Sequence, residues 1–140
     1  MRAPDSCTLV EDAIAIAALY RTLARHLYVN RWRNCDLDPV ARAIIIENKW
    51  RAQRYGVHGT FVAEEGAVTV SEMLERAIAD TEADAAALGC GAEINRCRAI
   101  VDAGTSADFQ LAVFEAHKKG ASREGALRPV LEWIAAATLQ

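Results

Sequence analysis

The stretch ENKWRAQRYG, residues 47–56, decides how the middle of this chain is interpreted. It predicts a helix, because Gly56 directly after Tyr55 is a typical helix stop. Upstream, Asp38-Pro39 is a typical helix start, with an N-cap carboxylate followed by proline in the first turn. We therefore expect a helix from about Pro39 to Tyr55.

The polar residues of this helix lie on an unexpected face. At about 100° per residue, Glu47, Asn48 and Arg51 fall on an otherwise apolar arc around Ile44, while Trp50 falls on another face and is expected in the core. Unpaired burial of such polar groups is costly. Two interpretations remain open: a structural Glu47–Arg51 pair with Asn48 bonded to a nearby loop, or a surface that binds a ligand.

The same ten residues resemble the E-N-R-W-R-A-x-R-Y-G run of bacterial ATP-dependent carboxylate–amine ligases related to glutamate–cysteine ligase. Three other segments are similar to the family in order and spacing. They are RAPDSCT at residues 2–8, GCGAE at 89–93 and GTSADFQ at 104–110. The resemblance covers nearly the whole chain. It implies the helical C-terminal part of an α+β fold of the glutamate–cysteine ligase-like type (type 2).

The resemblance also implies a reaction. Such ligases use ATP and Mg to turn a carboxylate into an acyl phosphate, which an amine then attacks to form an amide. Positioned cations stabilise phosphoryl transfer, and a guanidinium can hold a phosphate or a carboxylate in a bidentate fork. We therefore select Arg2, Asn48, Arg51 and Arg54 as candidates for binding small-molecule substrates or phosphate. No catalytic residue and no metal ligand is selected.

The family places its nucleotide-binding and metal-binding carboxylates mostly on an upstream sheet, and the glutamate of its Glu-x-Arg motif would precede Met1 by one position. We therefore expect residues 1–140 to form one helical domain of a larger ligase, inactive alone and without ATP or Mg of its own. Its partner would be the N-terminal ligase portion or further copies of the chain. The alternative is a stand-alone helical interaction or regulatory module derived from a ligase.

Composition excludes several other classes. The 140 residues are 52% hydrophobic and 25% charged, which is typical of a globular domain. The net charge of −3 comes without a basic block, so we expect no nucleic-acid partner. No apolar run approaches the roughly 20 residues of a membrane span. Scattered cysteines and histidines predict no metal site, and the absence of an apolar signal region predicts a cytoplasmic protein.

The remaining pattern predicts a mainly α fold of about six helices with one small β-hairpin. A capping box at residues 8–11 starts the first helix, expected from Leu9 to Asn30. Its predicted buried stripe consists of Leu9, Ile16, Tyr20, Leu23 and Leu27. The hairpin is expected over residues 60–70. The other helices are expected at about 71–88, 92–103, 105–120 and 128–138, the last beginning late because proline disfavours a helix interior.

Overall fold

The computed structural model describes residues 7–35 and 38–139. Its elements, in chain order, are α1 (Val10–Val29), η1 (Arg31–Asn34), α2 (Pro39–Tyr55), η2 (Gly56–His58), β1 (Thr60–Ala63), β2 (Gly66–Thr69), α3 (Val70–Asp80), α4 (Glu82–Leu88), α5 (Gly91–Ala103), α6 (Ser106–His117) and α7 (Arg123–Thr138). The predicted mainly helical fold with one hairpin is confirmed. The described residues form seven α-helices, one more than expected, because the predicted third helix is divided.

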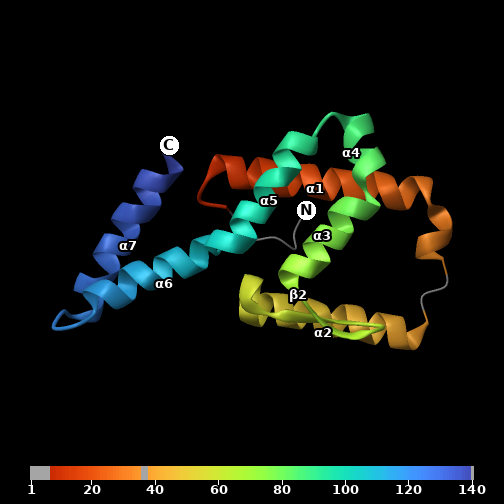
Figure 1. The fold of residues 1–140 in the computed structure, drawn as a ribbon. Helices are drawn as coiled ribbons and strands as arrows, with labels where there is room; N and C mark the ends of the chain where they lie inside the picture. The colour runs from red at the N-terminus through yellow and green to blue at the C-terminus, as the bar shows by residue number, and fades with distance from the viewer. Residues whose placement is uncertain (1–6, 36–37, 140) are drawn as a thin grey trace.

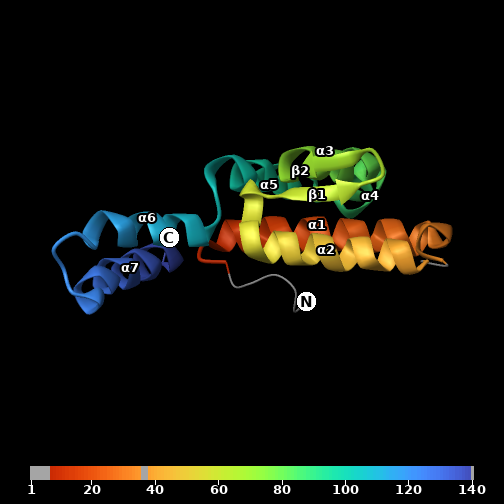
Figure 2. The same cartoon turned by 90° about the horizontal axis from the view of Figure 1, so that it is seen from below.

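The elements form two layers and an arm. Figure 2 shows α1 and α2 lying lengthwise in one layer, with α3, α4, α5 and the hairpin in the other. The helices α6 and α7 pack against each other and extend from one end of these layers (Figure 1). The long α1 is therefore covered by α4 and α5, whereas α2 is covered by the hairpin.

The main core lies where α1 meets α4 and α5. Ala18, Cys90 and Ile94 are buried there, and larger apolar residues pack around them. The predicted buried stripe of α1 is wrong, since Tyr20 is 55% exposed and Leu27 is 42% exposed. The buried residues of α1 are Ala15, Ala18, Thr22 and His26. The helix is apolar on two faces, and the face with small side chains is the one that packs, because small residues let helices approach closely.

The capping residues expected for α2 and α3 are observed, whereas the cap expected for α1 is not. The Asp38 side chain accepts a hydrogen bond from the Ala41 backbone N–H at 2.7 Å, as expected for the start of α2. Thr69 and Glu72 form a capping box at the start of α3. The capping box predicted at residues 8–11 does not form. The N-cap of α1 is Leu9, and the Thr8 hydroxyl contacts the Ser106 hydroxyl instead.

A break at Thr81 divides the helix that was expected over residues 71–88. The Thr81 hydroxyl donates to the Ala77 carbonyl at 2.6 Å, and the Thr81 backbone N–H is shared between the carbonyls of Ala77 and Ile78. A threonine side chain that bonds back to the preceding turn competes with the regular helical pattern. Thr81 is buried, so the break is fixed in the core between α3 and α4.

The last helix begins earlier than predicted. Ser122 caps α7 by accepting from the Gly125 backbone N–H at 3.1 Å, and the helix continues through Pro129. Ala126 is 1% exposed and Val130 is 7% exposed, so packing on both sides of Pro129 outweighs the cost of the lost hydrogen bond. Helix propensity alone misplaced this start because it omits that packing.

The hairpin is short and regular. β1 and β2 pair antiparallel, from Thr60 opposite Thr69 to Ala63 opposite Gly66. Gly66 has a φ of 121°, a backbone conformation that side chains other than glycine rarely adopt. Among the described residues, no helix is long and apolar enough to cross a membrane.

Candidate functional site

The polar arc of α2 packs against β1. Asn48 donates from its side-chain nitrogen to the Val62 carbonyl at 2.9 Å and accepts from the Val62 backbone N–H at 2.7 Å. One amide thus pairs with both backbone groups of a single strand residue, as a neighbouring strand would do. Asn48 therefore fixes the distance and orientation of α2 relative to β1.

Arg51 lies one turn further along the same face. Its Nε donates to a Glu47 carboxylate oxygen at 2.7 Å, and its Nη1 donates to the Thr60 hydroxyl at 3.3 Å. The Arg51 side chain is 30% exposed and that of Glu47 is 45% exposed, so the pair reaches solvent. A guanidinium has five N–H donors, and these contacts use two. The side chain is held in place and still presents donors outward.

Arg54 and Trp50 lie away from β1. The Arg54 guanidinium is 5.7 Å from the centre of the Tyr55 ring, and the structure gives it no carboxylate partner among the described residues. The Trp50 ring meets that of Tyr55 edge-on. Trp50 is 51% exposed, so the expectation that it belongs to the core is wrong: α2 packs on the hairpin through its opposite side. The fourth candidate, Arg2, lies outside the described residues.

A second polar contact joins the segment after α2 to the start of α6. His58 Nε2 lies 3.1 Å from one Asp108 carboxylate oxygen. The other oxygen accepts from the Thr105 backbone N–H at 2.7 Å and from its hydroxyl at 2.8 Å. The Thr105 backbone bond is the main reason why the pKa of Asp108 lies below its ordinary value, with His58 adding to the effect. The family-like segment at residues 104–110 is thus joined to η2, which begins where the family-like stretch of α2 ends.

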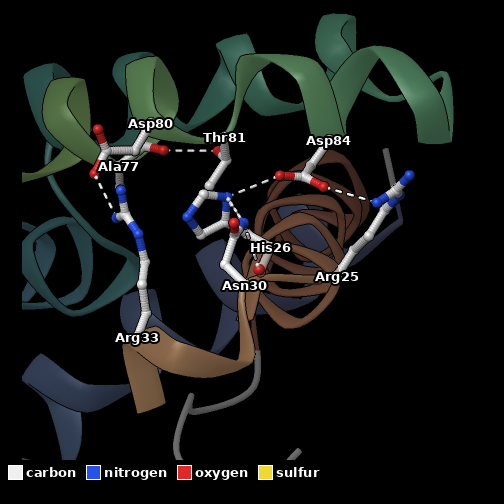
Figure 3. Close-up of polar contacts among 8 residues, drawn as sticks. All are labelled: Arg25, His26, Asn30, Arg33, Ala77, Asp80, Thr81 and Asp84. Carbon is white, nitrogen blue, oxygen red and sulfur yellow. Dashed lines mark hydrogen bonds and ion pairs between the residues drawn. The ribbon is translucent and has the colours of Figure 1, made fainter. Parts of the chain in front are cut away.

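A third polar cluster, around His26, was not predicted from the sequence (Figure 3). His26 Nδ1 lies 2.8 Å from one Asp84 oxygen, and Arg25 donates to the other at 2.9 Å. His26 is 9% exposed and Asp84 is 8% exposed. The Asn30 amide donates to the His26 carbonyl at 3.0 Å, close to the end of α1.

The second ring nitrogen of His26, Nε2, is buried and has no hydrogen-bond partner in the structure. Figure 3 shows the ring between α1 and the Thr81 break, beside the Arg33–Asp80 ion pair. The cluster therefore ties α1 to α4 at the point where α3 ends. A sequence signal did exist: a histidine on the small-residue face of α1 and an aspartate within an alanine run are both out of place on buried helix faces.

Comparisons with known proteins show the family to which the chain belongs. The family model "Glutamate-cysteine ligase family 2 (GCS2)" matches residues 1–132, and the chain belongs to this family. Relatives named "Putative glutamate--cysteine ligase 2" occur in Bradyrhizobium sp. (strain ORS 278), 54% identical over 139 residues, and in Rhodospirillum rubrum, 42% identical over 142 residues. Another, in Roseiflexus castenholzii, is 35% identical over 115 residues.

Coverage is unequal in these comparisons. The alignments with the Bradyrhizobium and Rhodospirillum proteins include 99% of this chain but only 33% and 36% of those relatives. For the Roseiflexus protein the shares are 81% and 30%. The chain therefore spans about a third of the length of the relatives it matches. No solved structure matches it.

Proposed function

We propose that the chain forms the helical third of an ATP-dependent carboxylate–amine ligase of the glutamate–cysteine ligase type. Such an enzyme joins a carboxylate to an amine through an acyl phosphate. The observation that carries the proposal is the family match over residues 1–132, together with relatives named for glutamate–cysteine ligation. On this proposal the 140-residue chain does not ligate substrates alone, because it spans about a third of those relatives.

Arg51 and Arg54 would contact the transferring phosphate or the substrate carboxylate. Glu47 and Thr60 orient the Arg51 guanidinium, which reduces the reorganisation needed when negative charge develops nearby. Arg54 is exposed at the end of the same helix, and its contact is with the Tyr55 ring rather than with an acid. Arg2 belongs to the same proposal through its position in the family-like segment at residues 2–8.

Asn48 would act as a positioning residue. Both of its polar groups bind Val62, so it contributes by setting the place of α2 on β1 rather than by touching a ligand. In the described part of the chain, no group of three or more His, Cys, Asp or Glu residues could hold a metal ion. We therefore assign no metal ligand to these residues and derive no step of the reaction through the metal.

Reconstitution tests the proposal. The chain is produced together with the part of the Bradyrhizobium relative that lies outside the matched segment, and ADP formation is measured with glutamate and cysteine. We expect Arg51→Ala and Arg54→Ala each to lower kcat/KM by roughly 100-fold. This is the loss in rate typical of removing one hydrogen-bond donor that stabilises charge in the transition state. Arg123→Ala, at an exposed position of α7 away from this helix, is the control and leaves kcat/KM unchanged. Ligation by the chain alone, or full activity of both arginine variants, would contradict the proposal.

The second candidate function is a stand-alone interaction or regulatory module. It is favoured by large apolar side chains that are exposed on α1 and α2, including Tyr28, Ile46 and Trp50. A stable complex of the 140-residue chain with itself, combined with no ADP formation in the reconstituted mixture, would support this function over the ligase.

A further inference from the structure

Helix α1 has a second apolar face opposite the one that is buried. Its residues repeat at intervals of three and four, which places them along one side of a helix. This outer seam consists of Val10, Ala13, Ala17, Tyr20, Ala24 and Leu27. Val10 is 56% exposed and Tyr20 is 55% exposed. A helix that is apolar all round is normally covered on both sides.

Helix α2 repeats the pattern on its side away from the hairpin. Ala43, Ile46 and Trp50 follow each other at intervals of three and four. Ile46 is 70% exposed, and no residue of α2 is buried, although all of its residues are described. The outer side also carries the exposed cations Arg42 and Lys49.

The two outer faces belong to one layer. In Figure 2, α1 and α2 lie on the same side of the molecule, and no other described helix or strand covers the side turned away from α3, α5 and the hairpin. Packed domains consist of two or three layers that cover one another's apolar faces. The outer seam of α1 and the outer side of α2 are therefore apolar faces of the kind that another layer normally covers.

The solvent-accessible surface of the whole chain is larger than that of a typical folded monomer of the same mass. The chain exposes 9911 Å², whereas a folded monomer of 15.2 kDa exposes about 7,100 Å². The excess of roughly 2,800 Å² is much larger than the ~800 Å² that each partner contributes to a standard interface. It is comparable with one side of a large permanent interface. The α6–α7 arm, which extends from the two layers, contributes to this excess together with the outer faces of α1 and α2.

We propose that the outer seam of α1 and the outer side of α2 form the permanent docking surface for the remainder of the ligase, the roughly two thirds of the relatives that this chain does not span. The inference rests on the proposed function. The covering surface is apolar at its centre and carries carboxylates at its margin, where it meets the exposed Arg21 and Lys49. Such carboxylates would complement these two positive charges.

The test uses the full 140-residue chain and the separately produced remainder of the Bradyrhizobium relative. Light scattering and calorimetry measure a one-to-one complex. Ala24→Arg places a charge on the outer seam between Tyr20 and Leu27 and is expected to weaken binding at least 100-fold, because an interface core excludes unpaired charge. Ala99→Arg, at an exposed position of α5, is the matched control and leaves binding unchanged. Circular dichroism confirms that both variants fold like the parent chain.

A second measurement covers the case in which the remainder does not fold alone. The two parts are joined as one polypeptide, and Ala24→Cys is labelled with a thiol reagent beside the control Ala99→Cys. Peptide mass spectrometry reads the label at each position, because the chain also contains an exposed Cys35. We expect labelling at position 24 to be at least 10-fold slower in the joined protein than in the 140-residue chain, with no change at position 99. Equal labelling at position 24 in both contexts would overturn the proposal.

The possible results also show whether the docking proposal or the proposed ligase function has failed. A complex that depends on Ala24 but does not ligate supports the surface and contradicts the ligase. Ligation that survives Ala24→Arg with undiminished affinity supports the ligase and overturns the surface. A tight dimer of the 140-residue chain that Ala24→Arg dissolves, with no binding to the remainder, assigns the surface to a second copy and overturns the proposal.

Discussion

Helices α1 and α2 lie in the same layer and have similar lengths, yet they are held in place by different forces. Helix α1 buries Ala15 and Ala18 against the neighbouring α4 and α5, so the hydrophobic effect and close packing dominate. Helix α2 buries no residue and is fixed to β1 mainly through side-chain hydrogen bonds, above all those of Asn48. The same chain thus contains one packed unit and one hydrogen-bonded unit.

The difference implies unequal stability. Regions with few buried apolar contacts open at lower free energy than the core of the same protein. We expect the α2–hairpin unit to exchange its amide hydrogens faster than α1 and α5. The polar residues of that unit are the proposed substrate contacts, so a partner that docks there would order the site as it binds.

The largest effect is expected from breaking the packed unit. Ile94→Ala removes a side chain that is 2% exposed and leaves a cavity between α1 and α5, which costs about 2–5 kcal/mol of unfolding free energy. Urea unfolding followed by circular dichroism measures the change. Ile46→Ala on the exposed side of α2 is the control, expected below about 0.5 kcal/mol. Equal costs for the two variants would remove the distinction between the units.

The second effect tests the hydrogen-bonded unit. Asn48→Ala leaves both backbone groups of Val62 without their side-chain partner, at a cost of about 1–3 kcal/mol. Hydrogen exchange should accelerate in β1 and β2 but not in α5. Gln53→Ala, at an exposed position of α2, serves as the control. Uniform acceleration throughout the molecule would mean that α2 and α1 unfold as one unit.

The third effect concerns the contact between η2 and α6. Asp108→Ala removes the bonds to Thr105 and His58 and should cost about 0.5–2 kcal/mol at neutral pH, the range of helix caps. Because the folded state lowers the pKa of Asp108, this stabilisation is present above the ordinary carboxyl pKa and is lost as the pH falls through the lowered value. The parent and the variant should therefore converge in acid.

Thermal unfolding of both proteins between pH 7 and pH 3 measures this convergence. Ala112→Ser, at an exposed position of α6 without a titratable side chain, is the control, and its difference from the parent is expected not to change with pH. A gap between parent and Asp108→Ala that widens as the pH falls would contradict the assignment.

The smallest effect belongs to the Glu47–Arg51 pair. Because both side chains reach solvent, a double-mutant cycle with Glu47→Gln and Arg51→Leu should give a coupling energy of only about 0.2–1 kcal/mol. A coupling energy several times larger would mean that the pair is chiefly structural and would weaken the proposed role of Arg51 in binding a ligand.

The positions of the helices could be predicted largely because local signals agree with the observed starts. Asp38-Pro39 and Gly56 bound α2 as expected, and Thr105 precedes α6. Such signals act within one turn of the chain and need no knowledge of its neighbours. The break at Thr81 escaped prediction because a threonine that bonds back to the helix resembles any other helical threonine in sequence.

The buried face of α1 could not be predicted for a different reason. Both faces are apolar, and hydrophobic period alone favours the one with larger side chains, including Tyr20 and Leu27. The structure buries the smaller face, because the neighbouring helices come close to it. In the candidate site, the arc around Ile44 was identified correctly from the helical period. The hydrogen bonds from Asn48 to Val62 could not be predicted, because they depend on where the hairpin packs. No local sequence pattern indicates the position of the hairpin relative to α2.

The two faces of α1 also bear on how natural selection acts on this gene. Ala15 is completely buried, so a larger side chain there would strain the fold in any context, and we expect selection to keep the position small. Ala13 and Ala24 lie on the outer seam, where the 140-residue chain tolerates many side chains. If the gene is translated as this chain alone, sequences from related strains should drift at positions 13 and 24 and stay constant at position 15. If the product always works inside a complete ligase, all three positions should be under the same restraint.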